Sequence, residues 1–288
     1  MANKEDIQAH YDNVPELFKA MLDESMIYSG AMWDGAKNLT TAQHHKMKYL
    51  AELGGYNEHT ESILDIGCGW GYGIQYLANA SPQLKSAVGL TISDAQYSYA
   101  NRKFCGENIR FIPGDCFETL KQLTQPFDTV ISIGAFEHFA NSRLKKRGQH
   151  IPRYRDFFSK VELLCRSHFG LQTIVSHRPL SAIPKNERKA YLGFLIYLNK
   201  YIFPNSLLPK VEDIIQASEH IFSAEKVEVN FQDYELTLKQ WLLNLEQATQ
   251  LKTTPDFQVY IKYIRLCIEQ FQSQNIGLAR FSFRKKNI

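Results

Sequence analysis

The sequence predicts an α/β protein with a doubly wound, mostly parallel sheet, an N-terminal helical segment and a helical cap insertion. From Ser62 onward, short apolar segments of strand length alternate with segments of helical periodicity, which is the pattern of a parallel sheet with helices on its faces. A glycine-rich turn follows the first of these strands, and residues 176–210 depart from the alternation. These three observations define the fold class that we expect.

Residues 1 to about 55 are expected to form helices around an irregular segment. Apolar residues recur at helical spacing from Leu17 to Leu22 and from Met47 to Leu50. The intervening Tyr28-Ser29-Gly30 stretch has no such periodicity.

Strands and helices then alternate to the end of the chain. Strands are predicted at 62–66, 86–90, 109–112, 128–133, 170–175, 225–233 and 278–284. Helices are predicted at 71–80, 94–105, 154–167, 211–222, 237–250 and 257–273. The pattern changes before the last two strands, which predicts an antiparallel edge strand.

Residues 176–210 contain the run from Ala190 to Leu198, which is apolar on nearly every side. Pro184, Pro204 and Pro209 flank this run. The run is interpreted either as a buried core helix or as a cap that contacts an apolar substrate.

Composition excludes several classes of protein. Hydrophobic content of 44% and charged content of 22% are ordinary for a globular domain, and a net charge of +3 does not indicate nucleic-acid binding. The segment 1–9 is polar, and no run approaches the length of a membrane span. The five cysteines lack C-x-x-C spacing, so we expect reduced thiols in a cytoplasmic protein and no metal site. Eighteen Phe, fifteen Tyr and three Trp suggest a pocket for an apolar or cationic ligand.

The glycine-rich turn carries the main functional signal. An apolar strand ends at Asp65, and Gly67, Gly69 and Gly71 follow at alternate positions, so a ligand can lie against the backbone. The spacing does not fit the G-x-G-x-x-G nicotinamide fingerprint. The form D-x-G-x-G-x-G is typical of S-adenosylmethionine-dependent methyltransferases, and a purely structural turn is the alternative. The sheet is therefore expected to be of the Rossmann-like, class I methyltransferase type.

Two further strand ends supply candidate contacts to this cofactor. Thr91, with Ile92 and Gln96 nearby, stands where many methyltransferases have an acidic residue for the ribose. Asp115 to Phe117 follow the third strand and suit an adenine ring, although Asp115 could equally serve as a helix N-cap.

Several motifs in chain order carry a resemblance to one group. They are His10-Tyr11-Asp12, Tyr28-Ser29-Gly30-Ala31-Met32-Trp33, Asp65 to Gly71, Gly89-Leu90-Thr91-Ile92-Ser93, Ser132-Ile133-Gly134-Ala135-Phe136-Glu137-His138-Phe139, Phe203-Pro204 to Leu208-Pro209, and Tyr234 to Trp241. Together they resemble the cyclopropane-fatty-acid synthase-like methyltransferases, which include the mycolic acid cyclopropane synthases. The resemblance implies a single domain with a helical lid (1–55), a cofactor-binding core (56–177), a cap and substrate-side insertion (178–236), and closing helices and strand (237–288).

The resemblance also implies S-adenosylmethionine as methyl donor and S-adenosylhomocysteine as product. The expected cofactor-binding residues are Tyr28, Ser29, Asp65, Gly67, Gly69, Gly71, Thr91, Ile92, Gln96, Asp115, Cys116, Phe117 and Ile133. The expected substrate pocket comprises Trp33, Phe136, Phe139, His177 and Phe194, with plain core packing as the alternative for the aromatic residues.

In this family an alkene attacks the sulfonium methyl, and a bound bicarbonate takes the proton lost on ring closure. The resemblance assigns the bicarbonate to a Glu, a Tyr, a His and two Cys positions. Glu137 and Tyr234 match, whereas Gly30, Val175 and Phe283 stand at the other three positions, with His177 as a substitute for the His. These departures favour methylation without ring closure.

The main functional hypothesis is therefore carbon methylation of a lipophilic small molecule, an acyl chain or an isoprenoid, in a natural-product or lipid pathway. Glu137 would stabilise the cationic centre or accept a proton, or else pair with an arginine or cap a helix. His138 would act as a base or be structural, and Tyr234 would hydrogen-bond Glu137 or only pack. The alternatives are a cyclopropane-fatty-acyl synthase acting on an acyl-chain alkene, an N- or O-methyltransferase, and an inactive cofactor-binding relative.

The basic segment 143–155 is either a solvated surface or a contact for a phosphate or an acidic carrier protein. Peripheral contact with a membrane is also compatible with this sequence, whereas contact with nucleic acid is not expected.

Overall fold

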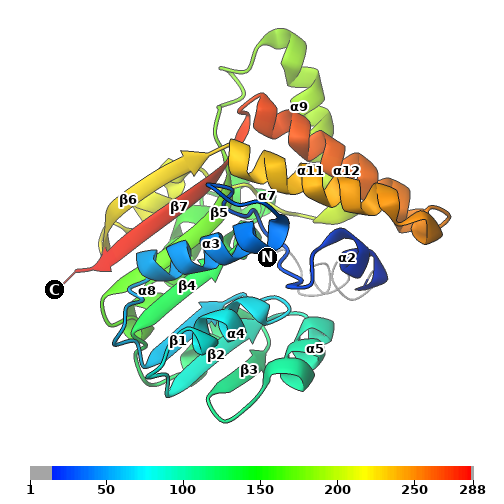
Figure 1. Ribbon diagram of the computed structural model, residues 1–288. Helices are drawn as coiled ribbons and strands as arrows, with labels where there is room; N and C mark the ends of the chain where they lie inside the picture. The colour runs from blue at the N-terminus through cyan, green and yellow to red at the C-terminus, as the bar shows by residue number, and fades with distance from the viewer. Residues whose placement is uncertain (1–14, 287–288) are drawn as a thin grey trace.

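The computed structural model describes residues 15–286, which form one seven-stranded sheet with helices on both faces (Figure 1). The strand order is β3-β2-β1-β4-β5-β7-β6. The strands are β1 (Ser62–Ile66), β2 (Ser86–Thr91), β3 (Ile109–Pro113), β4 (Thr129–Ile133), β5 (His168–Ser176), β6 (Phe222–Asn230) and β7 (Ile276–Lys285). The order and the antiparallel β7 are those of the class I methyltransferase fold, so the predicted fold class is confirmed.

The helices also follow the prediction closely. They are α2 (Pro15–Met21), α3 (Leu39–Leu53), α4 (Tyr72–Asn79), α5 (Asp94–Phe104), α6 (Cys116–Thr119), α7 (Ser142–Lys146), α8 (His150–Leu164), α9 (Lys185–Tyr197), α10 (Val211–Ser218), α11 (Gln232–Gln247) and α12 (Pro255–Gln272). Short 3-10 turns lie at 120–122, 136–138 and 249–251, and a π-helical turn extends α9 over 198–202. The motif His10-Tyr11-Asp12 lies outside the described residues.

The antiparallel strand is β7, and it lies second from the edge, between β5 and β6. Residues 276–283 of β7 are all buried, so this strand needs a neighbour on each side. The charged stretch from Glu225 to Glu228 lies on β6, which suits an exposed edge. β6 ends at Asn230, earlier than predicted, because the Asn230 side chain accepts a hydrogen bond from Asp233 N at 2.7 Å as α11 begins.

Alternating side chains of the central strands divide the core between the two faces of the sheet. Ile63 packs in a cluster with residues of α3 and α4, whereas Leu64 and Ile66 pack with residues of α8 and α10. A third cluster lies beyond the sheet and joins α2, α9, α11 and α12. In Figure 1, α11 and α12 lie side by side and α9 projects beyond them. No helix within residues 15–286 is long and apolar enough to cross a membrane.

Candidate active site

The glycine turn after β1 has a backbone that only glycine adopts readily. Gly67, Gly69 and Gly71 have φ values of +90°, +56° and +87°. At Gly71, a Cβ atom would lie 2.7 Å from the Ala100 Cβ and 2.9 Å from the Phe111 ring. Close packing of α5 and β3 against the turn therefore excludes any side chain at this position.

A cavity of about 1150 Å³, including its open part, lies at the carboxyl ends of β1, β2 and β4. The thirteen residues that the sequence assigns to the cofactor all lie in its wall, namely Tyr28, Ser29, Asp65, Gly67, Gly69, Gly71, Thr91, Ile92, Gln96, Asp115, Cys116, Phe117 and Ile133. This is the edge of an open α/β sheet at which ligands bind. The structure thus brings together segments that are up to about a hundred residues apart in the sequence.

Polar groups in this wall are already oriented. The Thr91 hydroxyl donates to Gln96 Oε1 at 2.8 Å, and both side chains are buried. Asp115 is the N-cap of α6, because its Oδ1 accepts a hydrogen bond from Phe117 N at 2.8 Å. This contact is the helix-cap role that the sequence offered as the alternative to adenine binding. Arg153, which the sequence analysis missed, also lies in the wall and stacks 3.2 Å from the centre of the Phe117 ring.

Asp65 and Lys46 form a buried pair of opposite charge in the cofactor cavity. Burial raises the pKa of Asp65, and the charge of Lys46 partly opposes this change. Burial and the charge of Arg280 lower the pKa of Lys46, whose Nζ donates to Ser29 Oγ at 2.8 Å. Lys46 lies on the buried face of α3 beside Gln43, and a lysine in that apolar pattern is the signal that could have found it.

S-adenosylmethionine fits this cavity, because polar atoms in the cavity wall lack partners in the described chain, and the cofactor could supply them. Asp65 Oδ1 is buried and has no hydrogen-bond partner within residues 15–286, so it can accept from an ammonium or hydroxyl group. The Trp70 Nε1 donor is likewise buried without a partner in this part of the chain. Asp65, Lys46 and the glycine turn would hold the amino-acid end of the cofactor, and Thr91 with Gln96 would hold its ribose end.

A second cavity of about 720 Å³ adjoins the first and shares Tyr28, Ser29, Gly134 and His138 with it. Its wall is mainly apolar and aromatic. Its apolar and aromatic residues include Ile174, Phe194, Leu198, Phe203, Leu208, Tyr263, Ile276 and Leu278. Such a cavity suits an apolar chain that reaches the donor from the opposite side.

Among the described residues that line this second cavity, Glu137 has the only carboxyl group. Its Oε1 accepts from Ile174 N at 2.6 Å, and its Oε2 is buried without a hydrogen-bond partner in the described chain. Burial raises its pKa from 4.5 to about 7, although the Ile174 and Glu137 N–H groups and the Thr173 hydroxyl favour the carboxylate. Glu137 is therefore poised to be charged or neutral near neutral pH.

His138 and Tyr234 lie in the same wall but differ in chemistry. Burial lowers the pKa of His138 to about 4, so its ring is neutral, and it packs 4.9 Å from the Phe203 ring. Tyr234 lies in the first turn of α11 rather than on a strand, and its ring contacts Trp241 and Phe271. Both side chains line the same cavity as Glu137, and the roles predicted for them stay predictions.

The predicted substrate pocket is only partly assembled. Phe194 lines the second cavity and Phe139 lines the first, where it packs on Phe117. In contrast to the prediction, neither cavity wall includes Trp33, Phe136 or His177.

Each of these three side chains is engaged elsewhere. Trp33 Nε1 donates to Thr237 Oγ1 at 3.0 Å. Phe136 packs in the core against Tyr154, and the exposed His177 ring lies 4.9 Å from Phe231. Aromatic composition alone therefore did not distinguish core from pocket.

Two residues that the resemblance assigns to the bicarbonate site, Val175 and Phe283, do not line the second cavity. Val175 and Phe283 both pack in the core cluster with α8, whereas Gln172 and Cys267 lie in the second cavity wall. Gln172 and Val175 lie on opposite faces of β5, because their separation along the strand is an odd number of residues. The strand alternation was the signal that could have identified Gln172.

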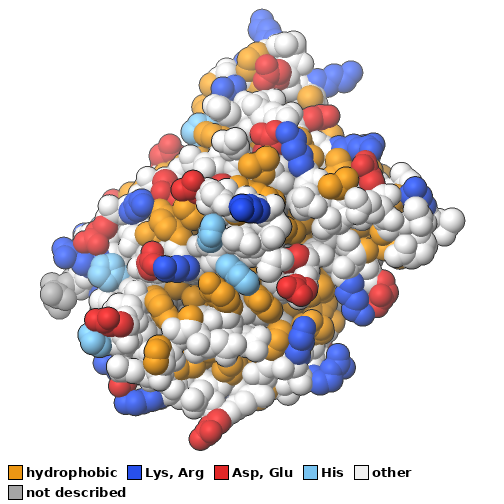
Figure 2. Space-filling view, in the orientation of Figure 1, with side chains coloured by type: hydrophobic (Ala, Val, Ile, Leu, Met, Phe, Trp, Pro, Cys, Tyr) orange, Lys and Arg blue, Asp and Glu red, His pale blue; other side chains and the backbone are white. Residues whose placement is uncertain are grey.

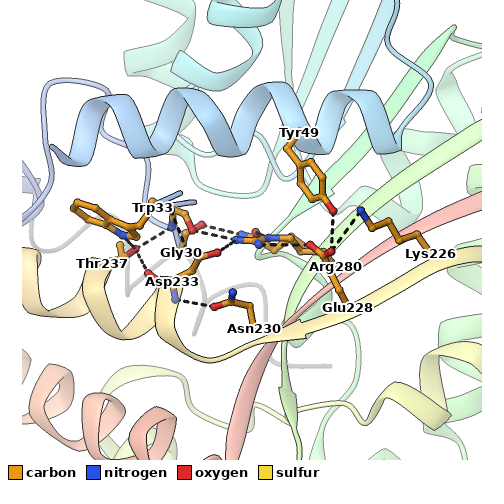
Figure 3. A network of polar contacts seen from close by, with 11 residues as sticks. Gly30, Trp33, Tyr49, Lys226, Glu228, Asn230, Asp233, Thr237 and Arg280 are labelled. Carbon is orange, nitrogen blue, oxygen red and sulfur yellow. Dashed lines mark hydrogen bonds and ion pairs between the residues drawn. The ribbon is translucent and has the colours of Figure 1, made fainter. Parts of the chain in front are cut away.

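A polar network fixes the loop that separates the two cavities (Figure 3). Gln172 Nε2 donates to Gly30 O at 3.1 Å, and Gln172 Oε1 accepts from Arg280 Nε at 2.9 Å. Arg280, only 2% exposed, also donates to Ala31 O at 3.1 Å and to Asp233 Oδ2 at 2.9 Å. The loop is thus tied to β5, β7 and α11 at once.

The basic segment 143–155 forms α7 and the start of α8. Arg143, Lys145, Lys146 and Arg147 form no ion pair with any residue from 15 to 286. Their partner, if they have one, stays a prediction.

Known proteins are similar to this chain in sequence and fold. The family model described as mycolic acid cyclopropane synthetase matches residues 1–281. The cyclopropane-fatty-acyl-phospholipid synthase of Escherichia coli (strain K12) is 32% identical over 282 residues, and the match covers 96% of this chain and 66% of the relative, so this chain spans about two thirds of that protein. Cyclopropane mycolic acid synthase 2 of Mycobacterium bovis is 28% identical, with 98% and 94% covered.

Among solved structures, the mycolic acid cyclopropane synthase CmaA1 complexed with SAH and CTAB superimposes with a TM-score of 0.84. It shares 27% identity, and the match covers 98% of each chain. With its sequence, fold and donor cavity in agreement, the chain belongs to the mycolic acid cyclopropane synthetase family of S-adenosylmethionine-dependent methyltransferases.

Proposed function

We propose that this protein transfers a methyl group from S-adenosylmethionine to an alkene carbon of a lipid acyl chain and closes a cyclopropane ring. The observation that carries the proposal is the buried Glu137 carboxyl group in an apolar cavity that adjoins the donor cavity. The names of the relatives support an acyl chain as substrate. The cyclopropane synthase hypothesis thus replaces methylation without ring closure as our main hypothesis.

The chain contributes position, exclusion of water and a base. When bound, the donor supplies an electrophilic sulfonium methyl group. Asp65 and Lys46 would orient the donor from one side, and the apolar wall around Phe194 would hold the alkene in line on the other. A dry wall matters because water would trap the carbocation formed beside the new methyl group.

Glu137 is the group that we assign to this cation and its proton. Its carboxylate stabilises a positive charge nearby in a site of low dielectric constant. One C–H bond of the new methyl group then breaks, its electron pair closes the ring, and the proton goes to the carboxylate. The higher pKa of Glu137 makes this transfer more favourable than it would be for an ordinary carboxylate.

We derive no step through the bicarbonate that the resemblance implies, because the groups at three wall positions are absent or already engaged. A Cβ at Gly30 would lie 2.8 Å from Leu278 Cδ2 and 2.9 Å from Tyr234 Cγ, so a side chain has no room there. The Gln172 side chain donates to Gly30 O and its oxygen accepts from Arg280, and the Ile174 N–H donates to Glu137.

The test supplies donor with a fully deuterated methyl group and unsaturated phospholipid, and weighs the product. Ring closure retains two deuterons, whereas simple methylation retains three. Glu137→Gln should reduce ring closure by about 100-fold. The matched control Glu107→Gln changes an exposed carboxyl group and should behave like the unmodified protein. Retention of three deuterons would restore the hypothesis of simple methylation, and full activity of Glu137→Gln would remove Glu137 from the mechanism.

A further inference from the structure

The segment 178–210, which carries α9, is rich in basic residues. It contains six Lys or Arg residues and a single acidic residue, Glu187, so its formal charge is +5, whereas the whole chain carries +3. The segment 143–155 is another basic stretch, with six Lys or Arg residues and no acidic residue, so positive charge gathers on these two segments. Charge concentrated in this way favours contact with an extended anionic surface.

The same segment exposes much of the apolar surface of the molecule. Within residues 15–286, seven large apolar side chains are exposed, and four of them lie here: Leu180, Leu192, Ile196 and Tyr201. Ile196 is 67% exposed and Leu192 is 44% exposed. Figure 2 shows basic and hydrophobic side chains intermixed on this projection.

The two faces of α9 have different partners. Lys185, Lys189, Leu192 and Ile196 follow one another at spacings of four, three and four residues, which places them in one exposed stripe. Phe194 and Leu198, on the other face, line the second cavity. A single helix thus separates solvent from the cavity that we assign to the acyl chain.

We propose that the exposed stripe of α9 docks on an anionic phospholipid bilayer, so that an acyl chain passes from the bilayer directly into the second cavity. This inference rests on the proposed function for the identity of the chain that enters. An interfacial helix buries its apolar side chains at the level of the headgroups while lysines contact the anionic lipids. Each lysine near such a surface strengthens binding, an effect that salt weakens.

The positive charge of this segment is free to make that contact. Lys185, Lys189 and Lys200 are exposed, and none forms an ion pair in the part of the chain that the structure describes. An acidic carrier protein would also match the charge. The exposed Leu192 and Ile196 favour the bilayer, because they gain little from a polar partner but are buried by lipid.

The experiment measures binding of the donor-loaded protein to vesicles of phosphatidylcholine, with and without phosphatidylglycerol. We expect binding to the mixed vesicles, loss of binding at high salt, and little binding to phosphatidylcholine alone. The double variant Leu192→Glu with Ile196→Glu should bind at least tenfold more weakly, with unchanged affinity for S-adenosylhomocysteine. Leu163→Glu is the matched control, since Leu163 is 70% exposed on α8, and it should bind normally.

Each result supports or overturns the proposal. Equal binding by the double variant, or equal weakening by Leu163→Glu, would overturn it. So would an unmodified protein that modifies detergent-dispersed lipid but binds no vesicle, and in that case the proposed reaction would stand. A protein that binds mixed vesicles through α9 yet modifies no lipid would support docking while contradicting the proposed reaction.

Discussion

Burial of Glu137 makes the stability of the fold depend on pH in a direction that can be worked out. The pKa of this carboxyl group is 4.5 ordinarily and about 7 in the folded protein. The folded state therefore holds the proton more tightly than the unfolded state does. The resulting stabilisation is complete below pH 4.5 and disappears as the pH rises through 7. The linkage relation gives a loss of about 2.5 kcal/mol between about pH 5 and pH 8.

Glu137→Gln isolates this effect. The amide keeps an oxygen for the Ile174 N–H but cannot ionise, so the variant should lack this part of the pH dependence. Urea unfolding of both proteins at the two pH values measures the difference. We expect the unmodified protein to lose about 2.5 kcal/mol more than the variant on going to the higher pH.

The control is Glu107→Gln, which replaces an exposed carboxyl group and should follow the unmodified protein. Parallel pH dependence of Glu137→Gln and the unmodified protein would refute the reasoning. It would mean that the Glu137 carboxyl group meets no desolvation penalty, and the argument for its basicity would fail with it.

Three other substitutions test the site and its support. Gly71→Ala should weaken binding of S-adenosylhomocysteine by at least about tenfold, because the new methyl group would overlap Ala100 and Phe111, whereas Gly106→Ala, with open space around it, should leave calorimetric affinity unchanged. Arg280→Met should cost about 3 kcal/mol in urea unfolding, because the Asp233 carboxylate loses its buried partner, and full stability of this variant would contradict that account. Phe194→Ala should raise the KM for acyl lipid by about tenfold without changing donor affinity, since it removes apolar contact only from the second cavity; a loss confined to donor binding would be the opposite result.

The donor cavity could be predicted from sequence because its determinants are local. Gly67, Gly69 and Gly71 lie on one turn, and Thr91 and Asp115 follow strands whose ends must meet at one edge of the sheet. Each position follows from a short segment and from the parallel order of the strands, without reference to distant side chains.

The second cavity could not be predicted as well, because it depends on which face a residue takes. Gln172 and Val175 are only three residues apart on β5, yet Gln172 lines the cavity and Val175 packs in the core. Cys267 lies on α12, where no strand end signals a site. Phe136 and Phe139 are equally aromatic, yet only Phe139 contributes to a cavity wall, and packing alone decides between them.

The hydrogen bonds that hold the loop between the cavities have a consequence for when the site forms during translation. Arg280, which holds Ala31 O, lies 249 residues after its partner, so the two meet only when the last strand has been made. A ribosome-bound chain can expose the complete glycine turn long before that point. We therefore expect a nascent chain that stops before β7 to lack a fixed wall between donor and acceptor. Competence for methyl transfer would then arrive only after β7 has been synthesised.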